Sequence, residues 1–299
     1  MTTETQTTQV IQNEALFAAY GEYVFKQDVI QGREVLRSIG NLALGNPPDF
    51  LHETVFDGTD FKTRQQVEDV RFMQFLETLG PDPYNAEPVQ ERIELLRAYD
   101  AFAPLVAPIT DLELDQSGVE LLGRGAVSET YAIEKDGQQY VARTIHNDED
   151  HITLETEYVQ GMLKAKGIKG LEQIVAVSYK DNMVISERAP GRTVDRLTTE
   201  DIVAITDQQL KDLVAAAQHA DDLGIVLDMF SGNILYDKEA GFTIVDLSCG
   251  VKETDRPIPV RLRNIIMHLH GAQANTPQFD GIRDSLLQRY DALFTTVQQ

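Results

Sequence analysis

Two short runs of β-branched and aromatic residues, joined by a five-residue turn, constrain the fold of this chain more than any other feature. The runs are Ile234–Tyr236 and Phe242–Val245, and the turn at residues 237–241 ends in glycine. This pattern predicts an antiparallel hairpin. Asn233 directly precedes the first strand and Asp246 directly follows the second, so pairing the strands brings both side chains to the same end.

A further carboxylate lies close by, because Asp228 precedes Asn233 by five residues. Carboxylate and amide oxygens are ligands that Mg²⁺ takes in proteins, and a second carboxylate can orient or deprotonate an acceptor hydroxyl. Phosphoryl transfer needs mainly such positioning and charge neutralisation. Asp and Asn also make turn hydrogen bonds in ordinary loops, so this spacing alone leaves a purely structural role open.

A glycine pair, Gly123 and Gly125, lies about a hundred residues upstream within a strand, turn, strand pattern at residues 118–133. Glycine has no Cβ, so backbone N–H groups at such a turn can approach phosphate oxygens closely. Asp136-Gly137 then predicts a turn into a strand at residues 139–145. The glycines join two strands, and no Gly-x-x-x-x-Gly-Lys-Ser/Thr sequence occurs, which excludes a dinucleotide-binding turn and a P-loop.

In this order, from about residue 114 to about residue 250, the motifs resemble those of the protein-kinase-like superfamily. The glycine pair resembles the glycine-rich loop. Arg143, in Val-Ala-Arg, takes the place of the lysine in the family's Val-Ala-x-Lys strand. Glu157, or its neighbour Glu155, resembles the helix glutamate that pairs with this cation. Arginine keeps the positive charge, but its planar guanidinium group is larger than the ammonium group of lysine and directs its N–H donors differently.

The resemblance extends through the centre of the chain. Residues 175–179 and 183–187 resemble the two strands that lead to the hinge of a kinase. Glu187 and Ala189 lie in the connector whose backbone meets adenine in that family. The resemblance therefore implies ATP as a cofactor.

The three oxygen-bearing side chains complete the resemblance. Asp228 takes the place of the catalytic aspartate, and Asn233 and Asp246 take the places of the Mg²⁺ ligands. The His-Arg pair that precedes the catalytic aspartate in the family is replaced by Val226-Leu227, and Asp-Phe-Gly is replaced by Asp246-Leu247-Ser248. Loss of that arginine removes the group that would hold a phosphorylated activation loop.

The resemblance implies an α+β, kinase-like two-lobed fold. An N-terminal helical domain (1–108) precedes a kinase-like domain (109–299), whose small lobe with an antiparallel sheet covers about 109–187 and whose short, mostly helical large lobe covers about 188–299. The expected activity is ATP-dependent transfer of the γ-phosphoryl group to a hydroxyl of a protein Ser/Thr or a small molecule. With only about fifty residues after Asp246 and no Ala-Pro-Glu segment, the pattern is closer to compact, atypical bacterial and archaeal kinases and to antibiotic or small-metabolite phosphotransferases. A pseudokinase that binds nucleotide or acts as a scaffold, and nucleotidyl transfer, remain alternatives.

Helical patterns flank these motifs. Apolar residues recur at helical spacing three times in the first hundred residues, at Leu16, Phe17, Tyr20 and Val24, at Val67, Val70, Met73 and Leu76, and at Val89, Ile93 and Leu96. Breaks are predicted at residues 46–48 and 104–108, and the polar residues 1–8 predict no regular structure. These helices form either a small domain packed on its own core or a module that binds a protein partner.

The C-terminal part is also predicted to be helical. Thr206-x-x-Gln209 has the form of a capping box, and Leu210, Leu213, Val214 and Ala217 follow it on one helix face. Apolar repeats within residues 260–269 and 279–293 predict two closing helices.

Charge and cysteine content limit the partners and the compartment. The formal net charge is −22 at pH 7, and without a basic patch counterion release offers no affinity for nucleic acid. An anionic membrane surface is disfavoured for the same reason. Cys249 is the single cysteine, so no intrachain disulfide is expected, and no N-terminal apolar segment resembles a signal peptide or spans a bilayer. The expected location is the cytoplasm.

Overall fold

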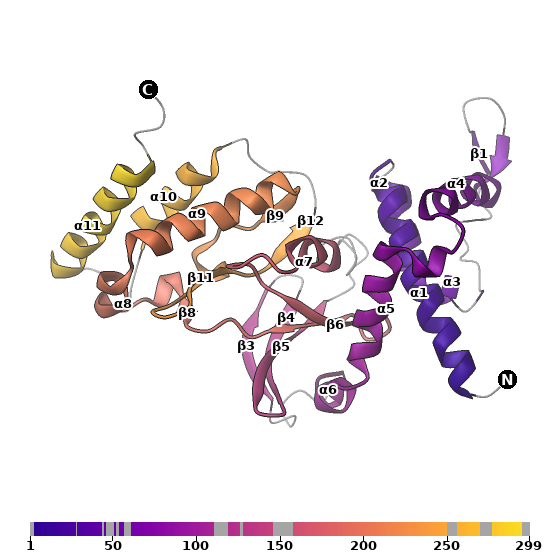
Figure 1. Cartoon of the computed structure of the whole chain (residues 1–299), viewed down its shortest axis with the longest axis horizontal. Coiled ribbons are helices and arrows are strands. Elements are labelled where there is room, and N and C mark those ends of the chain that lie inside the picture. The colour runs from indigo at the N-terminus through magenta and orange to yellow at the C-terminus, as the bar shows by residue number, and fades with distance from the viewer. Residues whose placement is uncertain are drawn as a thin grey trace. The chain divides into compact units, whose positions relative to one another are not determined.

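The structure is a computed structural model that describes residues 3–27, 29–43, 45, 51, 54–56, 61–110, 119–125, 128–145, 158–249, 256–269 and 277–294. It is a mixed α+β protein (Figure 1), which confirms the predicted class. Contacts divide the chain into two compact units. The first unit is Met1–Thr156 with Val175–Ser186, and the second unit is Glu157–Ile174 with Glu187–Gln299. The domain boundaries predicted from the sequence stay predictions.

The N-terminal part of the first unit is mostly helical. Its elements are α1 (Thr3–Phe25), α2 (Val29–Arg37), α3 (Ile39–Ala43), β1 (Thr54–Phe56), β2 (Phe61–Thr63), α4 (Arg64–Leu79), the 3₁₀ turn η2 (Pro83–Asn85), α5 (Glu87–Tyr99) and α6 (Ala103–Thr110). The three predicted helices lie in α1, α4 and α5. The prediction of an irregular start is wrong, because α1 begins at Thr3. No glycine or proline occurs in its first ten residues, so the helix propagates through them.

Helix α4 buries a different face from the one that its aliphatic residues predict. Val70 and Met73 are 58% and 59% exposed, whereas Glu68 and Phe75 are buried. The hydroxyl of Tyr20 donates to Glu68 Oε2 at 2.5 Å, and the Tyr20 ring packs against Phe75 with centroids 5.5 Å apart. Aromatic packing on α1 therefore decides which face of α4 is covered.

The predicted break at residues 104–108 is also wrong. Helix α6 runs through both prolines, and its Val106 and Ile109 are buried in a cluster with side chains of the neighbouring sheet. Pro104 occupies the second position of the helix, where a backbone N–H has no partner within the helix. The other predicted break, at residues 46–48, lies outside the residues that the structure describes.

A five-stranded antiparallel sheet forms the rest of the first unit. Its strands, in the order β3-β4-β5-β7-β6, are β3 (Glu120–Arg124), β4 (Ser128–Lys135), β5 (Gln138–Ile145), β7 (Met183–Glu187) and β6 (Ile174–Ser178). The predicted Asp136-Gly137 turn joins β4 to β5. Both of its residues have positive φ, 54° and 79°, as a type I′ hairpin turn requires.

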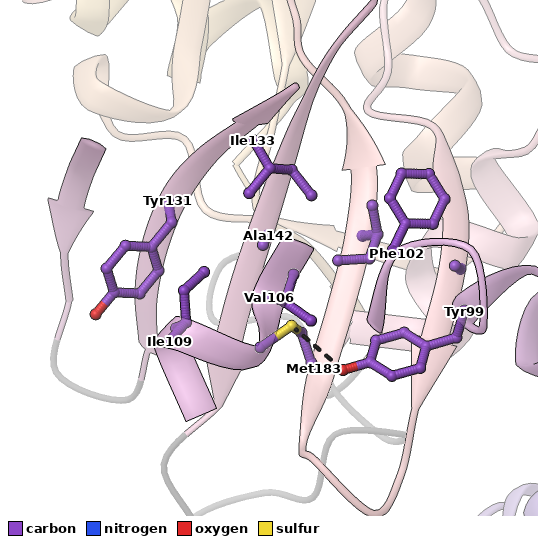
Figure 2. Packing of buried hydrophobic residues seen from close by; sticks show 10 residues of the cluster. Tyr99, Phe102, Val106, Ile109, Tyr131, Ile133, Ala142 and Met183 are labelled. Atoms are coloured by element: carbon purple, nitrogen blue, oxygen red, sulfur yellow. Dashed lines mark hydrogen bonds between the residues drawn. The ribbon is translucent and has the colours of Figure 1, made fainter. Parts of the chain in front are cut away.

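One face of this sheet is covered by the C-terminal end of α5 and by α6. Figure 2 shows Phe102 and Val106 packed over strand residues that include Ala142 and Met183. The hydroxyl of Tyr99 lies 3.7 Å from the Met183 sulfur in the same cluster. The helices before the sheet and the sheet itself therefore share a core.

The second unit contains short ladders and several helices. Its elements are α7 (Gln160–Ala165), β8 (Arg192–Thr193), the 3₁₀ turn η5 (Val194–Arg196), α8 (Thr199–Ala204), α9 (Asp207–Asp222), β9 (Ile225–Leu227), the 3₁₀ turn η6 (Ser231–Asn233), β10 (Ile234–Asp237), β11 (Gly241–Ile244), β12 (Leu247–Cys249), α10 (Ile258–Met267) and α11 (Pro277–Phe294). The last two confirm the predicted closing helices. In the part of the chain that the structure describes, no helix has the length and hydropathy of a membrane span.

The predicted capping box at the start of α9 is confirmed. Thr206 Oγ1 accepts a hydrogen bond from the Gln209 N–H at 3.2 Å, and Gln209 Oε1 accepts one from the Thr206 N–H at 2.9 Å. The four apolar residues predicted to follow on one face are buried. Local sequence signals therefore fix where this helix begins and which face it buries.

A second capping box, formed by Thr198 and the carboxylate of Asp201 at the start of α8, provides a test of stability against pH. It accepts hydrogen bonds from the Thr198 N–H and hydroxyl at 3.0 and 2.8 Å. Burial acts to raise the pKa of Asp201, but these bonds, with Arg192 and Lys238 nearby, outweigh it and hold the pKa below its usual value. The resulting stabilisation is present above the unfolded pKa of about 4 and is lost as pH falls through the folded pKa.

We therefore expect Asp201→Asn to be less stable than the wild type at pH 7, by roughly 1 kcal/mol. The difference should shrink as pH falls below about 4 and vanish only below the folded pKa of Asp201, where the wild-type carboxyl is also neutral. Urea unfolding of both proteins at a series of pH values measures this difference. A gap that stays constant with pH would contradict the assigned role of the charge.

Candidate functional site

The hairpin of β10 and β11 forms as the sequence predicts. Ile234 pairs with Ile244, and the Val245 N–H donates to the Asn233 carbonyl at 2.9 Å. Asn233 therefore enters the hairpin at the end where Asp246 leaves it.

A second ladder brings Asp228 to the same end. Strands β9 and β12 pair in antiparallel fashion, with Leu227 opposite Leu247. Asp228 directly follows Leu227 and Asp246 directly precedes Leu247, so the two aspartates flank one end of this ladder. The registers of the two ladders together gather Asp228, Asn233 and Asp246 within the second unit.

The amide of Asn233 is oriented by Asp228. Its Nδ2 donates to Asp228 Oδ2 at 2.9 Å and to the Asp228 carbonyl at 3.3 Å. The Phe230 N–H also donates to that carbonyl, at 2.7 Å, which closes the loop before η6. These contacts turn Oδ1 of Asn233 away from Asp228. Because Asp228 is exposed, its carboxylate can be reached by a substrate.

The backbone of Asp246 has an unusual conformation. Its φ is 63°, in the left-handed region that residues with a Cβ seldom adopt and that costs roughly 1–3 kcal/mol. The Asp246 N–H donates to Glu172 Oε2 at 2.9 Å, and Glu172 is only 4% exposed. The sequence reasoning missed Glu172, since no motif marks it and it lies 74 residues from Asp246.

Helix α7 packs closely on the strand that follows Asp246. A Cβ added to Gly161 would lie 3.0 Å from the backbone of Ser248 in β12, so only glycine allows this approach without a shift. Glu157 and Glu155, the predicted partners of the strand cation, lie outside the described residues.

In the first unit, Gly123 lies in β3 opposite Thr130, and Gly125 follows the end of that strand. The Gly125 N–H donates to the Ser128 carbonyl at 2.7 Å. A Cβ added to Gly123 would meet no described atom within 4 Å. Both glycines are exposed, so the backbone at these two residues can be approached by a ligand.

A short chain of polar contacts links β3 to β4. Arg124 Nε pairs with Glu129 Oε1 at 2.6 Å, and the Tyr131 hydroxyl donates to Glu129 Oε2 at 2.6 Å. Burial, together with the hydrogen bond to Glu129, raises the pKa of Tyr131 to about 12. The phenol therefore stays protonated at neutral pH and continues to donate.

Arg143 lies in β5 opposite Thr130, and it is 6% exposed. A guanidinium at such a position needs acceptor oxygens, and phosphate oxygens match its geometry well. Glu187 ends β7, is exposed, and donates its N–H to the Gln173 carbonyl at 3.0 Å. Ala189 follows in a half-buried connector without regular secondary structure.

The predicted site residues are thus distributed over both units. The structure brings together Asp228, Asn233 and Asp246 in the second unit, which also contains Glu187 and Ala189, whereas Gly123, Gly125 and Arg143 belong to the first unit. Among the described residues, no cluster of three or more His, Cys, Asp or Glu side chains is arranged to hold a metal ion. The predicted Mg²⁺ site consists instead of one carboxylate and one amide oxygen, a set that suits a cation whose remaining ligands are water and phosphate oxygens.

No protein-family model matches this chain, and no curated protein matches it either. An assignment of function therefore rests on the residues themselves.

Proposed function

We propose that this protein is an ATP-dependent phosphotransferase with a kinase-like two-lobed fold, whose acceptor is a hydroxyl of a protein Ser/Thr or a small molecule. The observation that carries the proposal is the pair of strand registers that gather Asp228, Asn233 and Asp246 at one end. Two carboxylates and an amide are the groups that phosphoryl transfer needs beside a nucleotide.

Each of the three residues has a chemical role in this proposal. Asp228 would accept a hydrogen bond from the acceptor hydroxyl and take its proton as the hydroxyl oxygen bonds to the γ-phosphorus and the bond from that phosphorus to the departing ADP breaks. Asn233, oriented by Asp228, and Asp246 supply oxygens for Mg²⁺, which when bound neutralises charge on the phosphate oxygens.

The remaining predicted residues would hold the nucleotide. Backbone N–H groups at Gly123 and Gly125 would cover the phosphates, and Arg143, with Glu157 as its proposed partner, would bind phosphate oxygens. The backbone from Glu187 to Ala189 would meet adenine. The exposure of both glycines supports the first of these roles. The proposed compartment is the cytoplasm, where ATP and Mg²⁺ are abundant.

Nucleotide binding and turnover on the wild-type protein test the proposal directly. We expect ATP with Mg²⁺ to raise the unfolding temperature more than ATP alone, because a ligand that binds only the folded state stabilises it. Labelled ATP should lose its γ-phosphoryl group to water or to an acceptor. If neither nucleotide binding nor turnover is detected, the proposed function is wrong.

A pseudokinase is the second candidate, and Arg143 is the observation that favours it. A buried arginine stands where the resemblance expects a lysine, and the two cations present different donor geometries to phosphate. Mg²⁺-dependent stabilisation by ATP without any turnover would support this alternative. The mass of a modified product would separate phosphoryl transfer from nucleotidyl transfer.

A further inference from the structure

The segment that leads into β6 is tied to the end of β11. The Ile244 N–H donates to the Gly170 carbonyl at 2.8 Å, and the Glu172 N–H donates to the Ile244 carbonyl at 2.9 Å. Leu171 pairs with Ile244 in a parallel bridge between these bonds. Hydrogen bonds on both sides of Leu171 therefore fix the backbone of Glu172 beside Ile244. Ile244 is the last residue of β11 and lies two positions before Asp246.

The Glu172 side chain also contacts Asp246, the proposed Mg²⁺ ligand. Its Oε2 accepts the Asp246 N–H at 2.9 Å, and 4% of the residue is exposed. A charged acceptor makes a stronger hydrogen bond than a neutral one, and more so away from water. The hydrogen bond stabilises Asp246, whose backbone has a φ of 63° and therefore persists only if surrounding contacts hold it there.

Other described non-glycine residues with positive φ sit in tight turns. Asp136 belongs to the β4–β5 hairpin turn, and Asn182 lies between β6 and β7. Asp246 instead joins two strands, β11 and β12, that belong to different ladders. The backbone conformation of Asp246 sets the direction in which the chain leaves β11 and enters β12. A change in its φ would therefore also move the Asp246 carboxylate.

We propose that Glu172 is a positioning residue that holds Asp246 in the conformation that binds Mg²⁺, an inference that rests on the function proposed above. Glu172 does not touch the metal in this scheme. It raises the fraction of molecules whose Asp246 is ready to bind. Since the apparent dissociation constant is the intrinsic one divided by that fraction, losing the hydrogen bond weakens Mg²⁺ binding.

Three substitutions separate this role from general support of the fold. Glu172→Gln keeps an oxygen that can accept the Asp246 N–H, Glu172→Asp shortens the reach by one methylene, and Glu172→Ala removes the acceptor. Asp201→Ala is the matched control, because it also removes a mostly buried carboxylate that accepts a backbone N–H in the second unit, at Thr198.

The measurement is an Mg²⁺ titration of the full chain at a fixed ATP concentration, in which the unfolding temperature reports binding. We expect Glu172→Ala to need roughly tenfold more Mg²⁺ for half of the shift. Glu172→Asp and the neutral acceptor in Glu172→Gln should need intermediate amounts, and Asp201→Ala the wild-type amount. In metal-free protein, hydrogen exchange at the Asp246 amide should be faster in Glu172→Ala than in Glu172→Gln.

The outcomes distinguish the inference from the function on which it rests. If Mg²⁺ has no effect on the wild type with ATP, the proposed function and the inference both fail. If the wild type responds but Glu172→Ala, or Glu172→Asp should the alanine variant not fold, keeps the wild-type midpoint, only the inference fails. The same holds if the midpoint shifts equally in Asp201→Ala.

Discussion

Asp246→Ala is expected to lower ATP-dependent phosphoryl transfer at least about a thousandfold and to remove the Mg²⁺-dependent part of stabilisation by ATP. The carboxylate lies at the end of the hairpin beside Asn233, and alanine offers no oxygen to a cation. Initial rates with labelled ATP, and unfolding temperatures with ATP in the presence and absence of Mg²⁺, measure the two effects.

Asp228→Asn is the informative companion variant. It keeps Asp246 and Asn233, so ATP with Mg²⁺ should stabilise it as it does the wild type. Without a carboxylate to take the acceptor proton, turnover should fall roughly a hundredfold to ten-thousandfold. Wild-type rates in Asp246→Ala, or equal loss of Mg²⁺ binding in both variants, would contradict the division of roles proposed for the two aspartates.

Gly191→Ala is expected to destabilise the second unit by about 3 kcal/mol or more. Gly191 has a φ of 90°, and a Cβ there would overlap the Tyr236 carbonyl in β10 and lie 2.9 Å from the Asp237 nitrogen. The next residue, Arg192, already pairs with Tyr236, so the strand cannot move away without breaking that pairing. Urea unfolding followed by circular dichroism measures the loss.

Gly167→Ala is the matched control for this overlap. Gly167 also lies in the second unit and has a φ of 78°, but a Cβ there would meet no described atom within 4 Å. Its substitution should therefore cost only the backbone strain, about 1–2 kcal/mol. If the two alanine variants lose the same stability, the contact between Gly191 and Tyr236 does not constrain the fold.

The parts of the structure that local sequence signals determine were predictable. The Asp136-Gly137 turn, the Thr206 capping box and the hairpin after Asn233 each depend on residues within a few positions of one another. Turn chemistry, side-chain caps and alternating apolar residues act at that range. For the same reason the sequence predicted that Asn233 and Asp246 meet at one end of a hairpin.

The features that the sequence did not predict depend on contacts between distant segments. Glu172 reaches Asp246 across 74 positions, and the covered face of α4 follows from aromatic residues on α1. Helix α6 includes Pro104 and Pro108, where a break was predicted, because its apolar residues pack on a sheet whose strands come later in the chain. Periodicity in one segment carries no information about which partner covers it.

The order of segments along the chain also sets the order in which the first unit can be completed during synthesis. Strand β7 (Met183–Glu187), the neighbour of β5, follows the Glu157–Ile174 segment of the second unit. A nascent chain that has reached Thr156 therefore exposes an unpaired edge of β5, which favours pairing with other chains. At ribosomal rates of about 5–20 residues per second, this exposure lasts seconds. A fragment of the first unit prepared for separate study should accordingly extend through Glu187, the last residue of β7.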